Sequence, residues 1–516
     1  MKEQRQWSRI HWLAVLVLVL GSFLPGLFTC EARQSVSLVA ADAVPLRGVI
    51  EGFYGTPWTQ QERLDMIAFC GQQGFNAYIY APKDDPYHRS HWREPYPKQR
   101  LTDLAALVKA ASAAHVRFVF AVSPGLDLAY AGSAAQADRA AMLEKCEALY
   151  AVGVRDFAVF FDDIEQKDGA GQASFLNDIA AALRARHPDL GAILTVPTEY
   201  FRADMVDEAG QAKPYTASFA GKLSRDVIVL YTGEGVVKGD LTAAQRQAAE
   251  AVYGRPLGIW WNYPVTDYKM TNLALGPIER LPLAGVPAVF FNPMQHTQLS
   301  RLSLATGAAL ARDPAHYDPQ AAWHAAIVQQ YGGLAPAMET FAEHAQHLET
   351  NWAEIGRQDA PALRREMDDF WQSYPRGALL KLRARHLDKS LAQVEEATEA
   401  LRTGLPARSL AECQPQVDQL ARIVRADRRG LALLMAQRGK TASEADRAAF
   451  LAARSEVLQH DEEARISEKT ARAFLDELTE HLDLTPPAAN KCRAEFGTHG
   501  PLADGPCVPL QEDLLC

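Results

Sequence analysis

Two adjacent aspartates, Asp162 and Asp163, are the residues of this sequence best suited to acid–base chemistry. They follow an apolar run, residues 157–161, whose composition indicates a buried strand. A carboxyl group can donate or accept a proton, and it can also hold a polar group of a ligand. Because aspartate pairs also occur at helix caps and in turns, the meaning of this pair depends on the elements that position it.

Other polar and aromatic residues stand directly after further apolar runs. The candidates for ligand binding are Gly52, Lys83, Tyr200, Trp260, Asn262, Asp267 and Asn292. Each has an ordinary explanation when taken alone, such as a turn glycine, a surface lysine or a loop amide. Together they would supply the carboxylates, amides and aromatic rings that suit a sugar, which presents hydroxyls on its edge and C–H groups on its faces.

The apolar runs recur with a regular rhythm and are separated by longer amphipathic segments. Eight of them are expected to be strands: residues 48–50, 77–80, 117–122, 157–161, 192–196, 227–231, 257–261 and 288–291. Several are continuously apolar, which is typical of parallel strands buried on both faces. The intervening segments, for example residues 60–72, 101–114, 136–152, 174–186 and 242–253, have helical patterns.

Eight βα units within residues 45–315 predict an α/β fold, a (β/α)8 barrel of the TIM type, whose usual size is roughly 250 residues. A doubly wound sheet is the alternative, but no GxGxxG loop follows the first run. In a barrel the residues that follow the strands share the C-terminal rim. We therefore expect Asp162, Asp163 and the other candidates to converge on one site.

The composition changes near residue 318, where strand-like runs give way to long segments rich in Ala, Leu, Glu, Arg and Gln. Residues 318–484 are predicted to form an all-α helical bundle. Its expected helices are residues 319–331, 336–355, 361–374, 378–401, 408–438 and 443–482. Residues 485–516, rich in Pro and Gly, are predicted to be an irregular tail.

The adjacency of Asp162 and Asp163 bears on mechanism. Successive strand side chains point to opposite faces, so the two are not expected to face each other across a cleft. A retaining acid and nucleophile stand roughly 5–5.5 Å apart about the scissile bond, which neighbouring residues would struggle to satisfy. It is easier for one aspartate to move the proton while the other holds a substrate group that attacks, and two close carboxylates also raise each other's proton affinity.

Composition excludes some classes of function. The net charge of −10 and the lack of a long Lys/Arg run argue against a nucleic-acid partner. No spacing resembles a zinc site, since His344 and His347 have no further ligands in their pattern. Cys70 and Cys146 fall in helical patterns and are expected to be buried thiols. Two of Cys492, Cys507 and Cys516 could pair in an oxidising compartment, but the sequence does not say which.

The pattern of residues 1–40 predicts that the protein is exported. Lys2, Arg5 and Arg9 precede an apolar run, residues 12–28, as in a signal peptide. An uncleaved membrane anchor is the alternative, although a run of about 17 residues is marginal for spanning a bilayer. Cys30 weakly fits a lipoprotein acceptor. The expected location is the periplasm, the cell surface or the medium, and any membrane association would come from this anchor or lipid.

Six motifs closely resemble family 84 of the glycoside hydrolases, the group of O-GlcNAcases and bacterial β-N-acetylglucosaminidases. In order they are residues 48–58 (GVIEGFYGTPW), 80–85 (YAPKDD), 91–94 (HWRE), 123–127 (SPGLD), 161–164 (FDDI) and 197–200 (PTEY). The resemblance ends near Asn292 and covers roughly half the chain. Together the motifs are specific, whereas the helical region is only loosely similar.

The resemblance implies retaining, exo-acting hydrolysis of N-acetylglucosaminides, in which the 2-acetamido oxygen of the substrate attacks the anomeric carbon and forms an oxazoline. Asp162 matches the residue that orients the acetamido N–H, and Asp163 matches the general acid and later base. The residues that match substrate contacts are Gly52, Lys83, Tyr200, Trp260, Asn262, Asp267 and Asn292. The family uses no metal or cofactor, and its partner is a glycan or glycoprotein that carries N-acetylglucosamine.

One departure from the family pattern is Trp261, where the animal enzymes have an aspartate. Two other hypotheses remain open at this point. One is a hyaluronidase-type enzyme that degrades polymers with the same aspartates, and assays on polymers would separate it. The other is a non-catalytic glycan-binding barrel, against which the intact Asp162–Asp163 pair argues.

Overall fold

The computed structural model describes residues 43–482 except 376 and 378. The predicted signal peptide or anchor, Cys30 and the three cysteines of the tail lie outside these residues, so those predictions stay predictions. None of the helices that the structure describes has the length and apolar character needed to cross a bilayer. Cys70 and Cys146 are buried free thiols, as expected.

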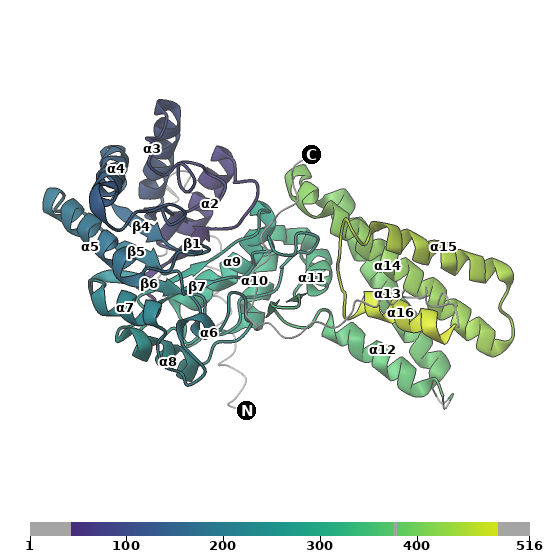
Figure 1. The fold of residues 1–516 in the computed structure, drawn as a ribbon. Coiled ribbons are helices and arrows are strands. Elements are labelled where there is room, and N and C mark those ends of the chain that lie inside the picture. The colour runs from purple at the N-terminus through teal and green to yellow at the C-terminus, as the bar shows by residue number, and fades with distance from the viewer. Residues whose placement is uncertain (1–42, 376, 378, 483–516) are drawn as a thin grey trace, which may run out of the picture. The chain divides into compact units, whose positions relative to one another are not determined.

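Eight parallel strands form a closed barrel in chain order (Figure 1). They are β1 (Leu46–Glu51), β2 (Ala77–Tyr80), β3 (Arg117–Val122), β4 (Asp156–Phe160), β5 (Ile193–Val196), β6 (Val227–Tyr231), β7 (Gly258–Trp261) and β8 (Ala288–Phe291). The barrel closes where Leu46 of β1 pairs with Ala288 of β8. The predicted (β/α)8 fold is confirmed, and each expected strand lies within two residues of its predicted ends.

Helices follow every strand of the barrel except β7. They are α2 (Gln60–Gln73), α3 (Lys98–Ala113), α4 (Gly132–Ala151), α5 (Gly169–Arg186), α6 (Arg202–Met205), α7 (Pro214–Lys222), α8 (Ala243–Tyr253) and α9 (Thr297–Arg312). Their ends follow local sequence signals: Thr59 and Glu62 form a capping box at the start of α2, and Gly74 ends it with a positive φ of 81°. The connection from β7 to β8 differs, because residues 262–287 form a long loop with no helix.

Strand side chains alternate between two apolar cores. In β2, for example, Ala77 and Ile79 belong to the small cluster inside the barrel, whereas Tyr78 and Tyr80 belong to the larger cluster that includes the surrounding helices. The two neighbouring tryptophans of β7 divide in the same way. Trp260 closes the interior near the rim, and Trp261 packs outward, so only the first can line a site inside the barrel.

The helical region follows the barrel. Its elements are α10 (Pro319–Tyr331), η1 (Gly332–Leu334), α11 (Ala335–Glu343), β9 (Leu348–Glu349), β10 (Glu354–Ile355), α12 (Pro361–Ser373), α13 (Leu380–Gly404), α14 (Ala407–Gly439), α15 (Glu444–His460) and α16 (Ala471–His481). Helices α13, α15 and α16 each pack against α14 (Figure 1). This confirms the expected helical region.

Two of the predicted helices in this region are wrong. Residues 336–355 are not one helix, because α11 ends at Glu343 and the small β9–β10 hairpin follows. His344 is therefore a buried cap residue whose Nδ1 lies 2.7 Å from Ser467 Oγ, and it shares no helix face with His347. Residues 443–482 form two helices, separated by a segment that includes Ser467 at a φ of 54°.

A buried ion pair fastens the end of β1. Glu51 is fully buried and accepts hydrogen bonds from Nε and Nη2 of Arg63 in α2, the shortest from each at 2.9 and 2.8 Å, and a short one from the Tyr78 hydroxyl. The pair ties the first strand to the first helix one residue before Gly52. It therefore fixes the strand end that begins the rim.

Replacing Arg63 with Met should lower the free energy of unfolding by about 3–5 kcal/mol, because it leaves the buried Glu51 carboxylate without its cation. Urea denaturation followed by circular dichroism measures the change. The matched double variant Glu51→Gln/Arg63→Met should lose less stability, since no buried charge remains. A single variant as stable as the wild type would contradict this account.

Candidate active site

The nine residues singled out in the sequence lie at the C-terminal ends of the strands, and direct contacts link them. Hydrogen bonds join Lys83 to Asp162, Tyr200 to Asp163, and Asn262 to both Trp260 and Asn292. The remaining contacts run through Gly52, which binds Asn292, and through Tyr54, which connects Asp267 with Asp163. The predicted convergence is therefore observed, although the chemical role of each residue is a separate question.

Lys83 and Asp162 form an ion pair at the centre of this cluster. Their side chains are only 2% and 6% exposed, and the ammonium makes a short contact with Asp162 Oδ2. The same ammonium lies 5.6 Å from the centre of the Tyr54 ring and 5.7 Å from that of Trp260. The other carboxylate oxygen, Asp162 Oδ1, is buried and has no hydrogen-bond partner among the residues described here.

Asp163 lies in a different environment. Its side chain opens to solvent, and each of its oxygens accepts a hydrogen bond from a tyrosine: Oδ2 from Tyr54 at 2.7 Å and Oδ1 from Tyr200 at 2.8 Å. Burial, and next the charge of Asp163, raise the pKa of both tyrosine hydroxyls, which therefore stay protonated and able to donate.

Strand alternation does not separate the two aspartates, contrary to the sequence argument. Strand β4 ends at Phe160, and Asp163 has a φ of 55°, so the chain has left the extended conformation. Because the backbone turns there, both carboxylates face the same group of side chains, including Lys83 and Tyr54. The two aspartates differ in their environments instead: Asp162 is buried and ion-paired, whereas Asp163 accepts hydrogen bonds from two hydroxyl groups.

The surroundings of Asp163 favour its ionised form. Although the side chain reaches solvent, partial desolvation by the surrounding rim works toward a higher pKa. The charge of Lys83 and the hydrogen bonds from Tyr54 and Tyr200 outweigh this effect and hold the pKa of Asp163 below the usual value. The charge of Arg89 acts in the same direction. A proton on Asp163 would therefore require a change in these contacts.

One wall of the site is built from β1, β7 and β8. A Cβ atom at Gly52 would lie 2.5 Å from Cζ2 of Trp260, so only glycine lets the β1 end pack against the indole. Trp260 Nε1 donates to Asn262 Oδ1 at 2.8 Å, and Asn292 Nδ2 donates to the same oxygen at 3.0 Å. These contacts hold an aromatic face and two amides beside the Lys83–Asp162 pair.

Asp267 occupies the loop between β7 and β8. Its Oδ2 accepts the backbone N–H of Tyr54 at 2.8 Å, and burial raises the pKa of this carboxyl. The contact ties the loop after β7 to the loop after β1. Tyr54 is thus bound at both its backbone and its hydroxyl.

The loop after β2 adds a residue that sequence reasoning missed. Arg89 donates from Nη1 to the Tyr54 hydroxyl and from Nη2 to the backbone oxygen of Asp163, each at 3.0 Å. It stands nine residues after Tyr80, the last residue of β2, rather than at the strand end itself. Only its position in a loop after a barrel strand could have drawn attention to it.

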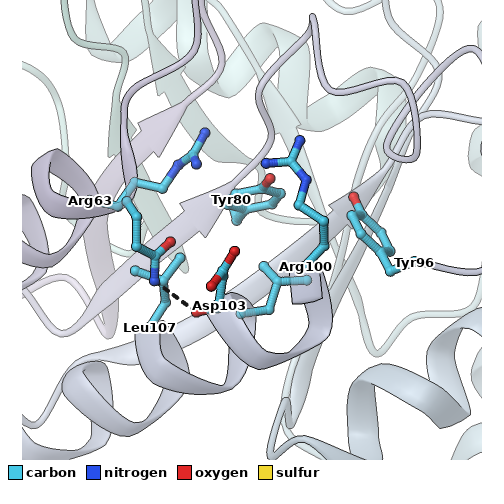
Figure 2. A pocket seen from close by; sticks show the side chains of 8 residues that line it. Arg63, Tyr80, Tyr96, Arg100, Asp103 and Leu107 are labelled. Carbon is cyan, nitrogen blue, oxygen red and sulfur yellow. Dashed lines mark hydrogen bonds between the residues drawn. The ribbon is translucent and has the colours of Figure 1, made fainter. Parts of the chain in front are cut away.

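Two other places differ from this cluster in size or chemistry. A cavity of about 10 Å³ beside α2 and α3, bordered by Arg63, Tyr80, Asp103 and their neighbours (Figure 2), has room for about one water molecule. His347, Glu349 and Glu354 have ligand atoms within 4.8 Å of one another, as a cation site requires. However, Glu349 already pairs with Lys469 and His347, so charge balance there needs no metal.

The strand-end cluster combines three chemical capabilities. Asp162 offers a buried acceptor, Asp163 is a solvent-accessible carboxyl that can exchange a proton, and the wall around Trp260 offers an aromatic face with amides. Such a combination suits acid–base chemistry on a polar ligand with apolar faces.

The sequence is similar to two mammalian proteins. It is 32% identical over 241 residues to Protein O-GlcNAcase of Rattus norvegicus and, equally, to that of Mus musculus. Each match covers 45% of this chain and 26% of the relative, so the chain corresponds to about a quarter of the length of these relatives.

The fold is similar to solved structures over most of the chain. The structure of CpGH84B has a TM-score of 0.78 and 33% identity, and the match covers 84% of this chain and 76% of that one. A mutant of the Thermobaculum terrenum O-GlcNAc hydrolase has a TM-score of 0.72 and 26% identity, with 84% and 94% covered.

Two family models match in succession along the chain. Residues 362–475 match one described as hyaluronidase post-catalytic domain-like, a stretch that contains none of the nine rim residues. Residues 47–343, which hold the barrel except its first residue and include all nine rim residues, match the model of beta-N-acetylglucosaminidase. The chain therefore belongs to the beta-N-acetylglucosaminidase family, family 84 of the glycoside hydrolases.

Proposed function

We propose that this protein is a retaining exo-β-N-acetylglucosaminidase that releases terminal β-linked N-acetylglucosamine from glycoconjugates by substrate-assisted catalysis. Membership of the family supports the reaction class. The division of the two aspartates into a buried, ion-paired group and an accessible, hydroxyl-bound group supports the mechanism. The attacking atom is the carbonyl oxygen of the substrate's own 2-acetamido group.

The free oxygen of Asp162 is the observation that carries this proposal. A buried carboxylate oxygen without a donor is costly, and Asp162 Oδ1 finds none among the described residues. The N–H of a 2-acetamido group is a donor of the right kind. By accepting it, Asp162 would orient the acetamido oxygen toward C1 and stabilise the positive charge that grows on the nitrogen, while Lys83 holds the other carboxylate oxygen.

Asp163 moves the proton in both steps. First, it donates to the glycosidic oxygen as the bond from C1 to that oxygen breaks and the acetamido oxygen bonds to C1, which yields the oxazoline. Next, the Asp163 carboxylate takes a proton from water as the water oxygen bonds to C1 and the oxazoline ring opens. Two displacements at C1 retain its configuration. The sugar ring would lie against Trp260, with Asn262, Asp267 and Asn292 positioned to bind hydroxyls.

Replacement of Asp163 by Asn should slow hydrolysis most for substrates with poor leaving groups, because these need a proton on the departing oxygen. For alkyl N-acetylglucosaminides, kcat/KM should fall by about 10²–10⁴-fold. Dinitrophenyl glycosides, whose leaving group needs little assistance, should lose much less in the first step. Steady-state kinetics across a series of leaving groups gives the slope.

Asp84→Asn is the matched control, since Asp84 is an exposed aspartate in the loop of Lys83. It should behave as the wild type. An equal loss for every leaving group in Asp163→Asn would contradict the acid role, and wild-type protein that binds the glycosides without cleaving them would favour a glycan-binding barrel.

Fluorination of the substrate's N-acetyl group tests the attacker. An N-trifluoroacetyl substrate has an electron-poor carbonyl oxygen, so its kcat should be at least about tenfold lower than that of the N-acetyl parent. Asp162→Asn should lower kcat for the parent by about 10²–10³-fold, because a neutral amide stabilises the developing charge poorly. Equal rates for the two wild-type substrates would rule out the acetamido group as nucleophile.

Tyr200→Phe should move the alkaline limb of the pH profile upward. The Tyr200 hydroxyl stabilises ionised Asp163, so its removal raises the pKa of Asp163, and the acid keeps its proton to higher pH. We expect a shift of about 1 pH unit in kcat/KM, which reports the free enzyme. Tyr231→Phe, at the end of β6, is the control. An unmoved or lowered limb in Tyr200→Phe would contradict the assignment.

A further inference from the structure

Arg89, in the loop after β2, contacts the accessible aspartate of the site from two directions. We propose that Arg89 is a positioning residue for Asp163: it fixes the backbone of the acid directly and its carboxylate through Tyr54. The inference rests on the proposed role of Asp163 as the proton donor. It assigns a task to a residue that stands at no strand end and needs no contact with the sugar.

The contacts form a closed ring. Arg89 Nη2 donates to the backbone oxygen of Asp163 at 3.0 Å, and Nη1 donates to the Tyr54 hydroxyl at 3.0 Å. That hydroxyl donates in turn to Asp163 Oδ2 at 2.7 Å. One planar guanidinium therefore holds the main chain and, through one intermediate, the side chain of the same residue.

Asp163 needs such support because of its backbone. Its φ of 55° lies in the left-handed region, which residues other than glycine occupy only when their surroundings hold them there. Its side chain is also open to solvent, so packing alone does not select one rotamer. A proton donor that drifts by about 1 Å can lose about 10²-fold in rate.

The loop that carries Arg89 is itself anchored. The neighbouring His88 is fully buried, its Nδ1 lies 2.7 Å from the Ala121 backbone oxygen, and its Nε2 lies 3.2 Å from Ser123 Oγ. The backbone N–H of Ser123 donates to His88 oxygen at 2.9 Å. Burial lowers the pKa of His88 to about 3, so the ring stays neutral and this attachment to β3 persists at working pH. The backbone next to Arg89 is therefore held in place, which limits where its side chain can reach.

Charge alone is a simpler role for Arg89, and the two roles predict different results. The titratable and charged groups that act on Asp163 are Lys83, Asp162, Tyr54, Tyr200, Asp267 and Arg89. A lysine at position 89 would keep the positive charge. It lacks the planar fork that reaches two acceptors at once, so it would restore the charge without the ring of contacts.

The experiment compares Arg89→Met and Arg89→Lys with the wild type, using alkyl and dinitrophenyl N-acetylglucosaminides. For the alkyl substrate, Arg89→Met should lower kcat by about 10–10²-fold with little change in KM, and the dinitrophenyl substrate should lose far less in the first step. The alkaline limb of kcat/KM should move to higher pH. Arg89→Lys should return the limb toward its wild-type position but recover little of kcat.

Arg93→Met is the matched control, because Arg93 belongs to the same loop but pairs with Asp127 and Asp138. It should change stability alone, and circular dichroism and thermal unfolding establish that all variants are folded. Adding Arg89→Met to Asp163→Asn should cause no further loss, since the group it positions is gone.

Three results would overturn the positioning role: equal losses for both leaving groups, a change confined to KM, or full recovery of kcat by Arg89→Lys. The test is separate from that of the proposed function. If Asp163→Asn shows no dependence on the leaving group, the acid assignment fails. If Asp163→Asn shows it and Arg89→Met does not, only the role of Arg89 fails.

Discussion

The burial of Lys83 and Asp162 as an ion pair governs the organisation of the site. Two charges withdrawn from water are stable only when they meet each other and have their remaining hydrogen-bonding capacity satisfied. Lys83 meets the first condition, with the faces of Tyr54 and Trp260 around its ammonium. Asp162 Oδ1 does not meet the second within the described residues, so the site holds an acceptor whose natural complement is a donor from a ligand. The same ammonium lowers the pKa of Asp163, so one buried cation pairs with the first carboxylate and favours the ionised form of the second.

Much of this arrangement could be predicted from the sequence, for a physical reason. A parallel barrel sends every strand's C-terminal end to one rim, so eight apolar runs were enough to predict that Gly52, Lys83 and Asn292 would meet. The rest depended on backbone turns and loop contacts that have no period. Alternation failed at Asp163 because the strand had already ended. No sequence pattern marks Arg89, because its position depends on how His88 anchors a loop. The helical pattern of residues 336–355 likewise does not reveal the hairpin that follows Glu343.

The helical region contributes to the rim through carboxylates on its own helices and turns. Glu412 of α14 accepts hydrogen bonds from the backbone N–H groups of Gln298 and Leu299. These donors stand in the first turn of α9, just after β8, and have no acceptor within the helix.

A second carboxylate, Glu468, pairs with Lys269, two residues beyond Asp267, and accepts a hydrogen bond from Asn272 in the same loop. Since the connection from β7 to β8 has no helix of its own, these contacts supply the support that a barrel helix supplies elsewhere. A structural role for this region in holding Asp267 follows from them.

The low proton affinity of Asp163 must be reconciled with its proposed task as an acid. Two tyrosine hydroxyls and two cations of the protein favour the carboxylate, which suits the second step, where a base activates water. The first step needs the proton. A bound glycoside removes solvent from this open carboxyl and places a glycosidic oxygen beside it, and both changes favour the protonated form. The protein groups around Asp163 therefore favour its ionised form, which acts as the base, whereas a bound substrate favours its protonated form, which acts as the acid. Proton transfer is thus linked to correct binding of the substrate.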